Sequence, residues 1–188
     1  MMRIEPVRAP RGLMVRVLFL ASRWMFGRVL APFGVLYARM PGFVRPQLGM
    51  VRFVEKGLSL PARVRALIEV HVSRVNECSF CGDLHEWAGR RVGVPAALFA
   101  ALDDVEGSAA LDAREKIALA YAAAVATRGV DDAMFARARA CWSDTEIVEI
   151  TFVAAFTTYL NLMGKALRLP SEGLCAPPVG VSRGTDRV

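Results

Sequence analysis

Residues 69–85 read EVHVSRVNECSFCGDLH, and this stretch is the most informative part of the chain. Cys78 and Cys81 are three positions apart at the expected start of a helix, so they lie on one face of it. Such a pair can close a disulfide with modest adjustment. The free N–H groups and the dipole of a helix N-terminus favour the thiolate form of a cysteine. The stretch therefore predicts a pair of thiols able to do redox chemistry.

A histidine follows the pair by one helical turn. His85 lies four positions after Cys81 and shares its face of the helix. A neutral imidazole can take the thiol proton, and an imidazolium can stabilise the thiolate. We therefore expect His85 to take part in proton transfer at the thiols.

The remainder of the chain is also expected to be helical. It contains no convincing strand alternation and no hairpin turn of the Asn-Gly type. A helix over 61–76, with an apolar side, leads into the thiol pair. The other predicted helices are 13–26, 47–56, 80–92, 95–102, 111–127, 133–141 and 144–167, with breaks at Pro32, Pro41 and Pro46.

Several helix ends carry capping signals. Ser59 is a plausible N-cap for the helix that leads into the thiol pair, and Asp131 or Asp132 for the helix over 133–141. Ser143 with Glu146 forms a capping box at the start of the last helix. The centre of that helix, 147–162, is almost wholly apolar, which predicts that it is the most buried element.

The pattern Cys-x-x-Cys-x-x-x-His, preceded by Ser73-Arg74-Val75-Asn76, resembles the AhpD-like alkylhydroperoxidase and carboxymuconolactone decarboxylase family. Trp142-Ser143-Asp144 and Asn161 are similar to the second half of that family, and the resemblance covers about residues 35–169. It implies an all-α, AhpD-like helical bundle with the Cys-x-x-Cys at a helix N-terminus.

The resemblance also implies roles for the site residues. Cys81 would be the attacking thiol, Cys78 the resolving thiol, and His85 part of a proton relay. The family's relay includes a Glu twelve positions before the first Cys, where this chain has Ala66. We assign that role to Glu69, one turn later, because an acid in apolar surroundings is suited to proton transfer. An ion pair of Glu69 with Arg65 or Arg74 is the equal alternative.

These roles predict a thiol-dependent peroxidase that reduces small hydroperoxides through Cys78 and Cys81. It would need no tightly bound cofactor, because an external dithiol, protein or small molecule, would reduce the disulfide. Ser79 and Phe80 stand where efficient peroxidases of the family can carry a His. The alternatives are a carboxymuconolactone-decarboxylase-like lyase, which needs no Cys pair, and a non-enzymatic oligomeric binding protein. The resemblance implies a homo-oligomer, a trimer or a hexamer.

Other interpretations of the cysteines and histidines stay open. Cys78 and Cys81 could be inert buried thiols, or zinc ligands with Cys141, although a second Cys-x-x-Cys or His pair is absent. Haem attachment would need a His where Gly82 stands. Cys141 and Cys175 are expected to be inert, with a disulfide between them conceivable, and His71 is expected to be structural.

The composition and the distribution of charge indicate which partners the chain can have. The chain has 188 residues, of which 54% are apolar, and its mean hydropathy is +0.35. That is enough for one domain with a core and for apolar subunit contacts. Nine of the arginines fall in residues 1–52, where Glu5 is the only acid. A basic arm can bind anionic lipid or nucleic acid, but here the arginines are interleaved with apolar residues.

We therefore expect the N-terminal helix to pack, with Phe19, Trp24 and Phe26 covering a neighbouring subunit or the thiol pocket. No phosphate-binding glycine loop or aromatic-basic platform indicates a nucleic-acid partner. The predicted organisation is a basic amphipathic arm (1–45), a helical domain (46–170) and a flexible tail (171–188). The longest uncharged N-terminal stretch, 29–38, is shorter than the ~20 residues of a membrane span. The chain is therefore expected to be cytoplasmic, where free thiols are the default.

Overall fold

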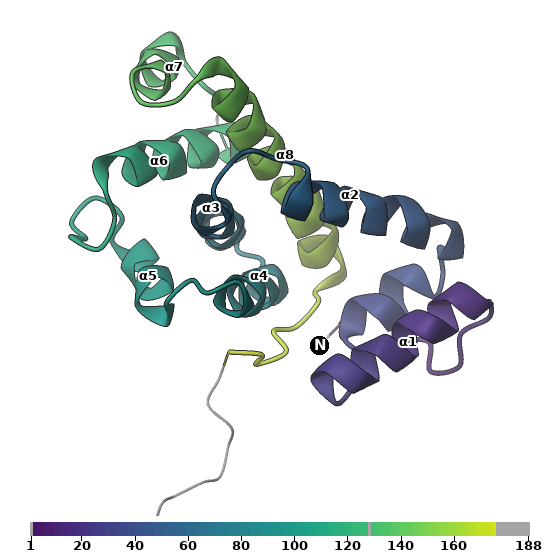
Figure 1. Cartoon of the computed structure of the whole chain (residues 1–188). Coiled ribbons are helices and arrows are strands. Elements are labelled where there is room, and N and C mark those ends of the chain that lie inside the picture. The colour runs from purple at the N-terminus through teal and green to yellow at the C-terminus, as the bar shows by residue number, and fades with distance from the viewer. Residues whose placement is uncertain (1, 128, 176–188) are drawn as a thin grey trace, which may run out of the picture.

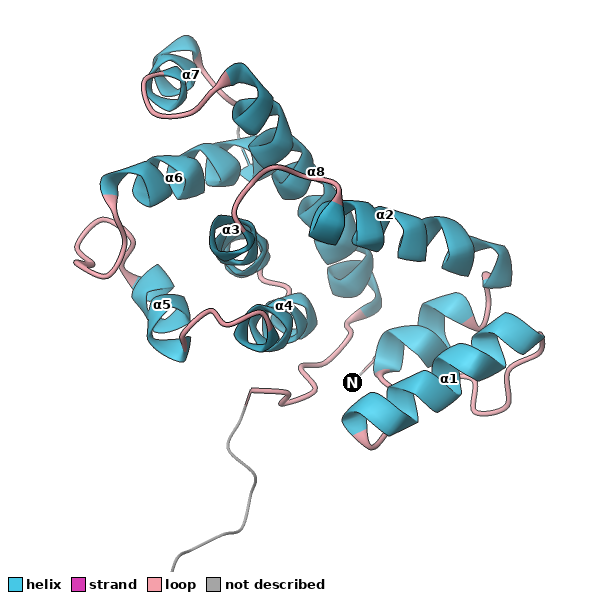
Figure 2. Cartoon of the chain, viewed as in Figure 1, coloured by secondary structure: helices cyan, strands magenta, loops and turns pink. Residues whose placement is uncertain are grey.

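The computed structural model describes residues 2–127 and 129–175 (Figure 1). Within these residues the chain forms helices and no strand, which confirms the all-α class (Figure 2). The α-helices are, in chain order, α1 (Leu13–Phe26), α2 (Val44–Lys56), α3 (Ala62–Val75), α4 (Ser79–Arg91), α5 (Ala96–Ala100), α6 (Ala113–Thr127), α7 (Asp132–Arg139) and α8 (Asp144–Leu167). A π-helical turn (Phe33–Tyr37) and two 3₁₀ turns (Pro41–Phe43, Ala101–Asp103) complete them.

Helix α3 is the centre of the bundle. It packs against α4, α5, α6 and α8, which surround it in Figure 1. Its buried residues occur on all sides of the helix and include two polar ones; they are Val64, Arg65, Ala66, Leu67, Ile68, Val70, Val72 and Ser73. A helix enclosed in this way fixes the positions of the elements that carry the site.

The prediction that α8 is the most buried element is wrong. Helix α8 has one buried stripe against α3 and α6, while Val148 and Leu162 on its other side are 67% and 60% exposed. The apolar composition of a helix does not show how many of its faces pack against other elements. By length and composition α8 could also cross a membrane, but its buried stripe is that of a core helix.

The capping signals predict several ends correctly. Ser143 and Glu146 form the capping box, and the Asp131 carboxylate accepts a hydrogen bond from the Met134 N–H to cap α7. Ser59 is not the N-cap of α3; its N–H and hydroxyl donate to Glu149 of α8 instead. Helix α2 begins before Pro46, because a proline in the first helical turn gives up an N–H that has no partner anyway.

The N-terminal layer, residues 13–56, lies against one end of the bundle. The Phe26 ring lies 4.6 Å from the Trp87 ring of α4, and the Phe53 ring lies 5.5 Å from the Phe152 ring of α8, measured between centroids. The predicted boundary at residue 45 falls inside α2. One face of α1 is buried, but Trp24 on the opposite face is 87% exposed.

Residues 169–175 run back along the start of α4. The Asp83 carboxylate accepts hydrogen bonds from the backbone N–H groups of Glu172, Leu174 and Cys175. The Glu172 carboxylate forms an ion pair with Arg28 (3.0 Å) and accepts from the Ala31 N–H. The start of the expected flexible tail is thus held in place, and its remainder, 176–188, lies outside the described residues.

Candidate redox site

A tight turn sets the start of α4. Helix α3 ends at Val75, and Glu77 adopts a left-handed conformation with φ 55°. The chain then reverses, and the Cys78 N–H donates to the Ser73 carbonyl oxygen at 2.9 Å. Cys78 is the N-cap of α4, so Cys81 falls in the first turn, among the free N–H groups that favour a thiolate.

The two cysteines are joined. Cys78 and Cys81 form a disulfide with their Cα atoms 5.3 Å apart, within the usual range for such a bond. Both residues are buried, with 4% and 5% of their surface exposed. The predicted position of the Cys-x-x-Cys at a helix N-terminus is confirmed.

Helix α8 approaches the pair at a glycine. A Cβ on Gly164 would lie 2.9 Å from the Cys78 Sγ and 3.4 Å from the Cys81 Sγ. Real Cβ atoms essentially never come that close to the first of these sulfurs. The absence of a side chain at this position therefore lets the disulfide sit against α8.

A buried polar network ties α8 to the turn before Cys78. Asn161 is completely buried; its Nδ2 donates to the Ser73 Oγ, and its Oδ1 accepts from the Asn76 Nδ2, both at 3.1 Å. The Ser73 hydroxyl in turn donates to the Glu69 carbonyl oxygen at 2.7 Å. The network thus fixes both the end of α3 and the direction in which the chain enters α4.

The structure brings His85 and Glu69 together. The His85 Nδ1 lies 3.6 Å from the Glu69 Oε2, with both side chains largely buried. Arg74, one of the predicted ion-pair partners of Glu69, instead contacts Asp103 at 2.7 Å and Glu86 at 3.8 Å. Ala66 is buried against α4 and carries no acid. Glu69 is therefore the carboxylate that can orient His85.

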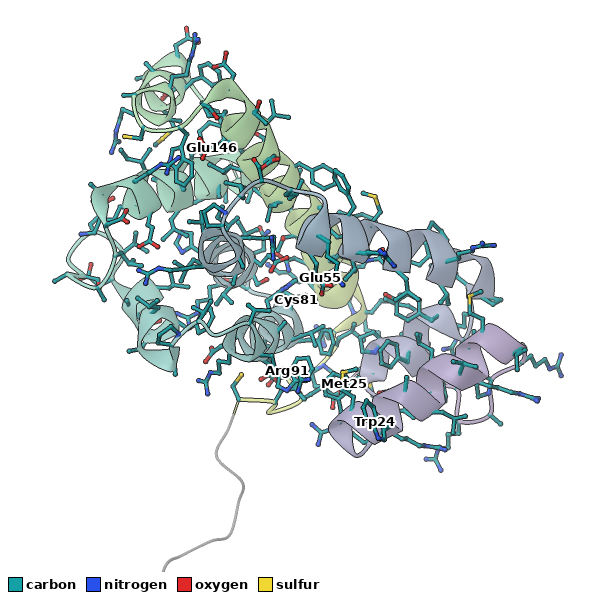
Figure 3. The ribbon with its side chains drawn as sticks, in the orientation of Figure 1. Trp24, Met25, Glu55, Cys81, Arg91 and Glu146 are labelled. Carbon is teal, nitrogen blue, oxygen red and sulfur yellow. A yellow bond between two sulfur atoms is a disulfide. The ribbon has the colours of Figure 1, made fainter. Side chains whose placement is uncertain are left out.

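A cavity of about 460 Å³ opens beside these residues. Cys81, His85 and Glu69 line it, whereas Cys78 does not. Figure 3 shows Cys81 and Glu55 in the region between α4 and the end of α2. Most of the lining is apolar and aromatic, and much of it comes from the N-terminal layer: Phe26, Leu30, Phe33, Leu36, Tyr37, Phe43, Val51 and Val54.

Tyr37 is a polar group on this wall. Burial, with a smaller contribution from Tyr159, raises the pKa of Tyr37 to about 12. Its phenol therefore stays protonated near neutral pH and can donate a hydrogen bond to a bound molecule.

The remaining cysteines lie apart from this chemistry. Cys141 and Cys175 are free thiols, so the conceivable disulfide between them is not formed. Burial, and next the nearby Glu86, raises the pKa of Cys175, which disfavours its thiolate. Among residues 2–127 and 129–175 no three His, Cys, Asp or Glu side chains cluster closely enough to hold a metal ion.

Comparisons with known proteins agree on the fold. No family model matches the chain. The uncharacterized protein YnjA of Escherichia coli K12 is 28% identical over 157 residues, covering 81% of this chain and 85% of that protein. An uncharacterized peroxidase-related protein from Silicibacter sp. TM1040 is 23% identical, with TM-score 0.76 over 90% of this chain and 91% of its own.

A protein of unknown function from Agrobacterium tumefaciens, a candidate antioxidant defence protein AhpD, is 25% identical, with TM-score 0.66 over 73% of this chain and 96% of its own. A variant of the debrominase Bmp8 in complex with 2,3,4-tribromopyrrole is 16% identical, with TM-score 0.78 over 93% and 94%. The chain therefore has an AhpD-like helical fold, with a thiol pair at the head of α4. Proteins of this fold include enzymes.

Some residues of the site were not predicted. Gly164 and Tyr37 lie far from the thiols in sequence, and nothing in their local pattern relates them to Cys78 or Cys81. For the N-terminal lining, the sequence predicted only that Phe26 covers either a neighbouring subunit or the thiol pocket. Arg65 also lines the cavity. The sequence carried a signal for it, because it is a charged residue inside the apolar face of the predicted helix over 61–76.

Proposed function

We propose that this protein is a cytoplasmic thiol peroxidase that reduces organic hydroperoxides through Cys81 and Cys78. One observation carries the proposal: of the two cysteines, only Cys81 lines the cavity, where the His85–Glu69 pair also lies. A hydroperoxide in that cavity would meet Cys81 first. Cys78, shielded behind it, is in position to resolve the product.

In the first step the Cys81 thiolate attacks the terminal oxygen of the hydroperoxide. An S–O bond forms while the O–O bond breaks, so the sulfur is oxidised to a sulfenic acid and the peroxide is reduced to an alcohol. The leaving alkoxide takes a proton from the His85 imidazolium. Glu69, 3.6 Å from the His85 Nδ1, orients the ring for this transfer.

In the second step Cys78 attacks the Cys81 sulfur. The S–S bond forms as the S–O bond breaks, and the hydroxyl leaves with a proton as water. The disulfide between these residues is the product of that step. An external dithiol then reduces it by thiol–disulfide exchange, and no bound cofactor is required.

Single cysteine variants test the scheme. Cys81→Ser should abolish turnover of cumene hydroperoxide with a dithiol reductant. Cys78→Ser, oxidised in the absence of the dithiol, should consume one equivalent of hydroperoxide and leave a sulfenic acid on Cys81, detected as a dimedone adduct by mass spectrometry. Cys141→Ser is the matched control and should keep wild-type turnover. Undiminished turnover in Cys81→Ser would exclude the proposal.

Glu69→Gln tests the relay. Loss of general acid–base assistance typically lowers a rate by 10²–10⁴-fold, so we expect the first oxidation of Cys81 to slow by at least tenfold. If Glu69 served only as an ion-pair partner of Arg65 and not of His85, that rate would be unchanged in Glu69→Gln. A lyase that needs no thiols remains the rival function, and activity retained when both cysteines are Ser would favour it.

A further inference from the structure

Among the described residues that line the cavity, Arg65 is the most deeply buried charged one. It lies on α3 with 9% of its surface exposed. The neighbouring arginines of α3 have acidic partners: Arg63 contacts Glu115 at 2.6 Å and Arg74 contacts Asp103 at 2.7 Å. Within residues 2–127 and 129–175 the Arg65 side chain makes no hydrogen bond or ion pair.

A guanidinium in such a position favours a bound anion. Its nitrogens are not among the fully buried polar atoms without a partner, so they are accessible from the cavity, and the group keeps its charge near neutral pH. Its N–H groups form a planar fork that matches a carboxylate with two parallel hydrogen bonds. The acids that line the cavity do not form an ion pair with Arg65, because Glu69 lies against His85 and Glu55 is exposed.

The packing of α3 on α4 gives the separation of Arg65 from the thiols. Glu69 faces His85, and a Cβ on Gly89 would lie 3.1 Å from the Ala66 Cβ, so the two helices run in opposite directions. Arg65 lies one turn before Glu69, and Cys81 lies one turn before His85. Arg65 and Cys81 are therefore about two helical turns apart, about 11 Å along the cavity.

The wall between these two positions is mostly apolar, with the Glu69–His85 pair about midway along it. Leu84, Trp87 and Ala88 of α4 line it, together with Phe26 from α1 and Phe156 from α8. It thus offers contact to a hydrocarbon body, and its two ionisable groups, Glu69 and His85, already face each other. Arg65 lies at one end of this wall and Cys81 at the other.

We propose that the cavity binds long-chain carboxylates, with the carboxylate on Arg65 and the chain running toward Cys81. Fatty-acid hydroperoxides whose peroxide lies about 11 Å from the carboxylate are then the preferred substrates. This choice of substrate rests on the proposed peroxidase function, whereas the carboxylate site itself does not.

Binding tests the site without any reaction. The probes are decanoic acid and decanol, titrated against the oxidised protein by calorimetry. A charged hydrogen-bonded pair in a buried site is worth about tenfold to hundredfold in affinity, so the wild type should prefer the acid by that factor. Arg65→Gln should bring the preference close to one, and Arg65→Lys should retain part of it.

Lys56→Gln is the matched control. It removes a cation that also lines the cavity but is exposed, so the preference for the acid should persist. Equal affinity for acid and alcohol in the wild type, or an undiminished preference in Arg65→Gln, would overturn the carboxylate site. Helical circular dichroism of each variant shows whether it is folded, and the Arg65→Lys result decides if Arg65→Gln is not.

Turnover separates the two proposals. The wild type should reduce linoleic acid hydroperoxide with at least tenfold higher kcat/KM than its methyl ester, and Arg65→Gln should reduce that ratio. Turnover of both without an acid preference would overturn the role of Arg65 and leave the peroxidase standing. No turnover of any hydroperoxide, with tight decanoate binding, would overturn the peroxidase and leave the carboxylate site.

Discussion

Gly164 makes the contact between α8 and the thiol pair possible, so adding a methyl group there is a direct test of that contact. In Gly164→Ala the new Cβ would lie 2.9 Å from the Cys78 Sγ. Overpacking of this kind costs about 1–3 kcal/mol, which offsets or exceeds the gain of about 1 kcal/mol from alanine in a helix interior. We expect an unchanged or lower urea midpoint and slower disulfide formation.

Gly49 of α2 is the matched control for that substitution. A Cβ there meets nothing within 4 Å, so Gly49→Ala should show the helix-propensity gain alone and raise the urea midpoint. If both variants gain stability equally, Gly164 does not hold α8 against the disulfide.

His71 predicts how stability depends on pH. Its Nδ1 is buried and has no hydrogen-bond partner among the described residues. Burial, and then the charge of Arg74, lowers the pKa of His71 below 6.5. The unfolded chain therefore takes up a proton before the folded one does, and stability falls as the pH drops below 6.5. Phenylalanine at this position removes the titration.

The measurement compares urea unfolding of the wild type and His71→Phe at about pH 7.5 and about pH 5.5. The wild type should lose more free energy of unfolding over this step than the variant does. Equal losses would mean that His71 titrates normally in the folded protein.

At the scale of elements, the Asn161 network joins α8 to the end of α3. Removing its side chain in Asn161→Ala deletes its hydrogen bonds with the Asn76 amide and the Ser73 hydroxyl, which keep only their contacts with Thr158 and the Glu69 carbonyl oxygen. Each hydrogen bond contributes about 0.5–1.5 kcal/mol, so we expect the loss of two to lower the free energy of unfolding by about 1–3 kcal/mol in urea unfolding. Leu162→Ala, at an exposed position of the same helix, should change stability by less than about 0.5 kcal/mol. Similar losses in both would argue against the network.

The helices themselves could largely be predicted from the sequence, because their ends are local. The capping box at Ser143 and the apolar run behind it give α8 its observed bounds. Burial could not be predicted in this way. Helix α3 is central although it contains Arg63, Arg65 and Glu69, since Arg63 and Glu69 find their partners on other elements and Arg65 faces the cavity. Only the tertiary structure shows which apolar helix is enclosed.

In the candidate site, too, local features could be predicted from the sequence and tertiary contacts could not. Cys78, Cys81 and His85 share one short stretch, so helical periodicity relates them. Glu69 could be proposed because it lies about one helical turn after Ala66, where the family that the chain resembles carries its relay Glu. Gly164 lies more than eighty residues from the thiols in sequence, and its role depends on how α8 crosses α4. No periodicity encodes such a crossing.

At the scale of the whole molecule, the N-terminal layer completes the site. Figure 3 shows Met25 of α1 and Arg91 of α4 in the region where that layer meets the bundle. Side chains from α1, the π-helical turn and α2 form one wall of the cavity beside Cys81. The basic arm expected from the charge distribution therefore lines the cavity through its apolar residues.

The outer face of α1 predicts an association of subunits. Leu13, Val17, Leu20 and Trp24 recur at helical spacing opposite the buried face, and all are exposed in the single chain. A helix that is apolar on two opposite sides is normally covered on both. We expect this face to join copies of the chain into the homo-oligomer that the resemblance implies. Light scattering after gel filtration should therefore give a multiple of 20.5 kDa.

Replacing both Leu20 and Trp24 with Glu should lower that mass, because two carboxylates would be buried without partners in the contact. Val148→Glu, at an equally exposed apolar position at the far end of α8, is the matched control and should keep the wild-type mass. A wild type that is monomeric at every concentration excludes the contact. Binding of that monomer to anionic vesicles, lost in the double variant, would assign the face to a lipid surface instead.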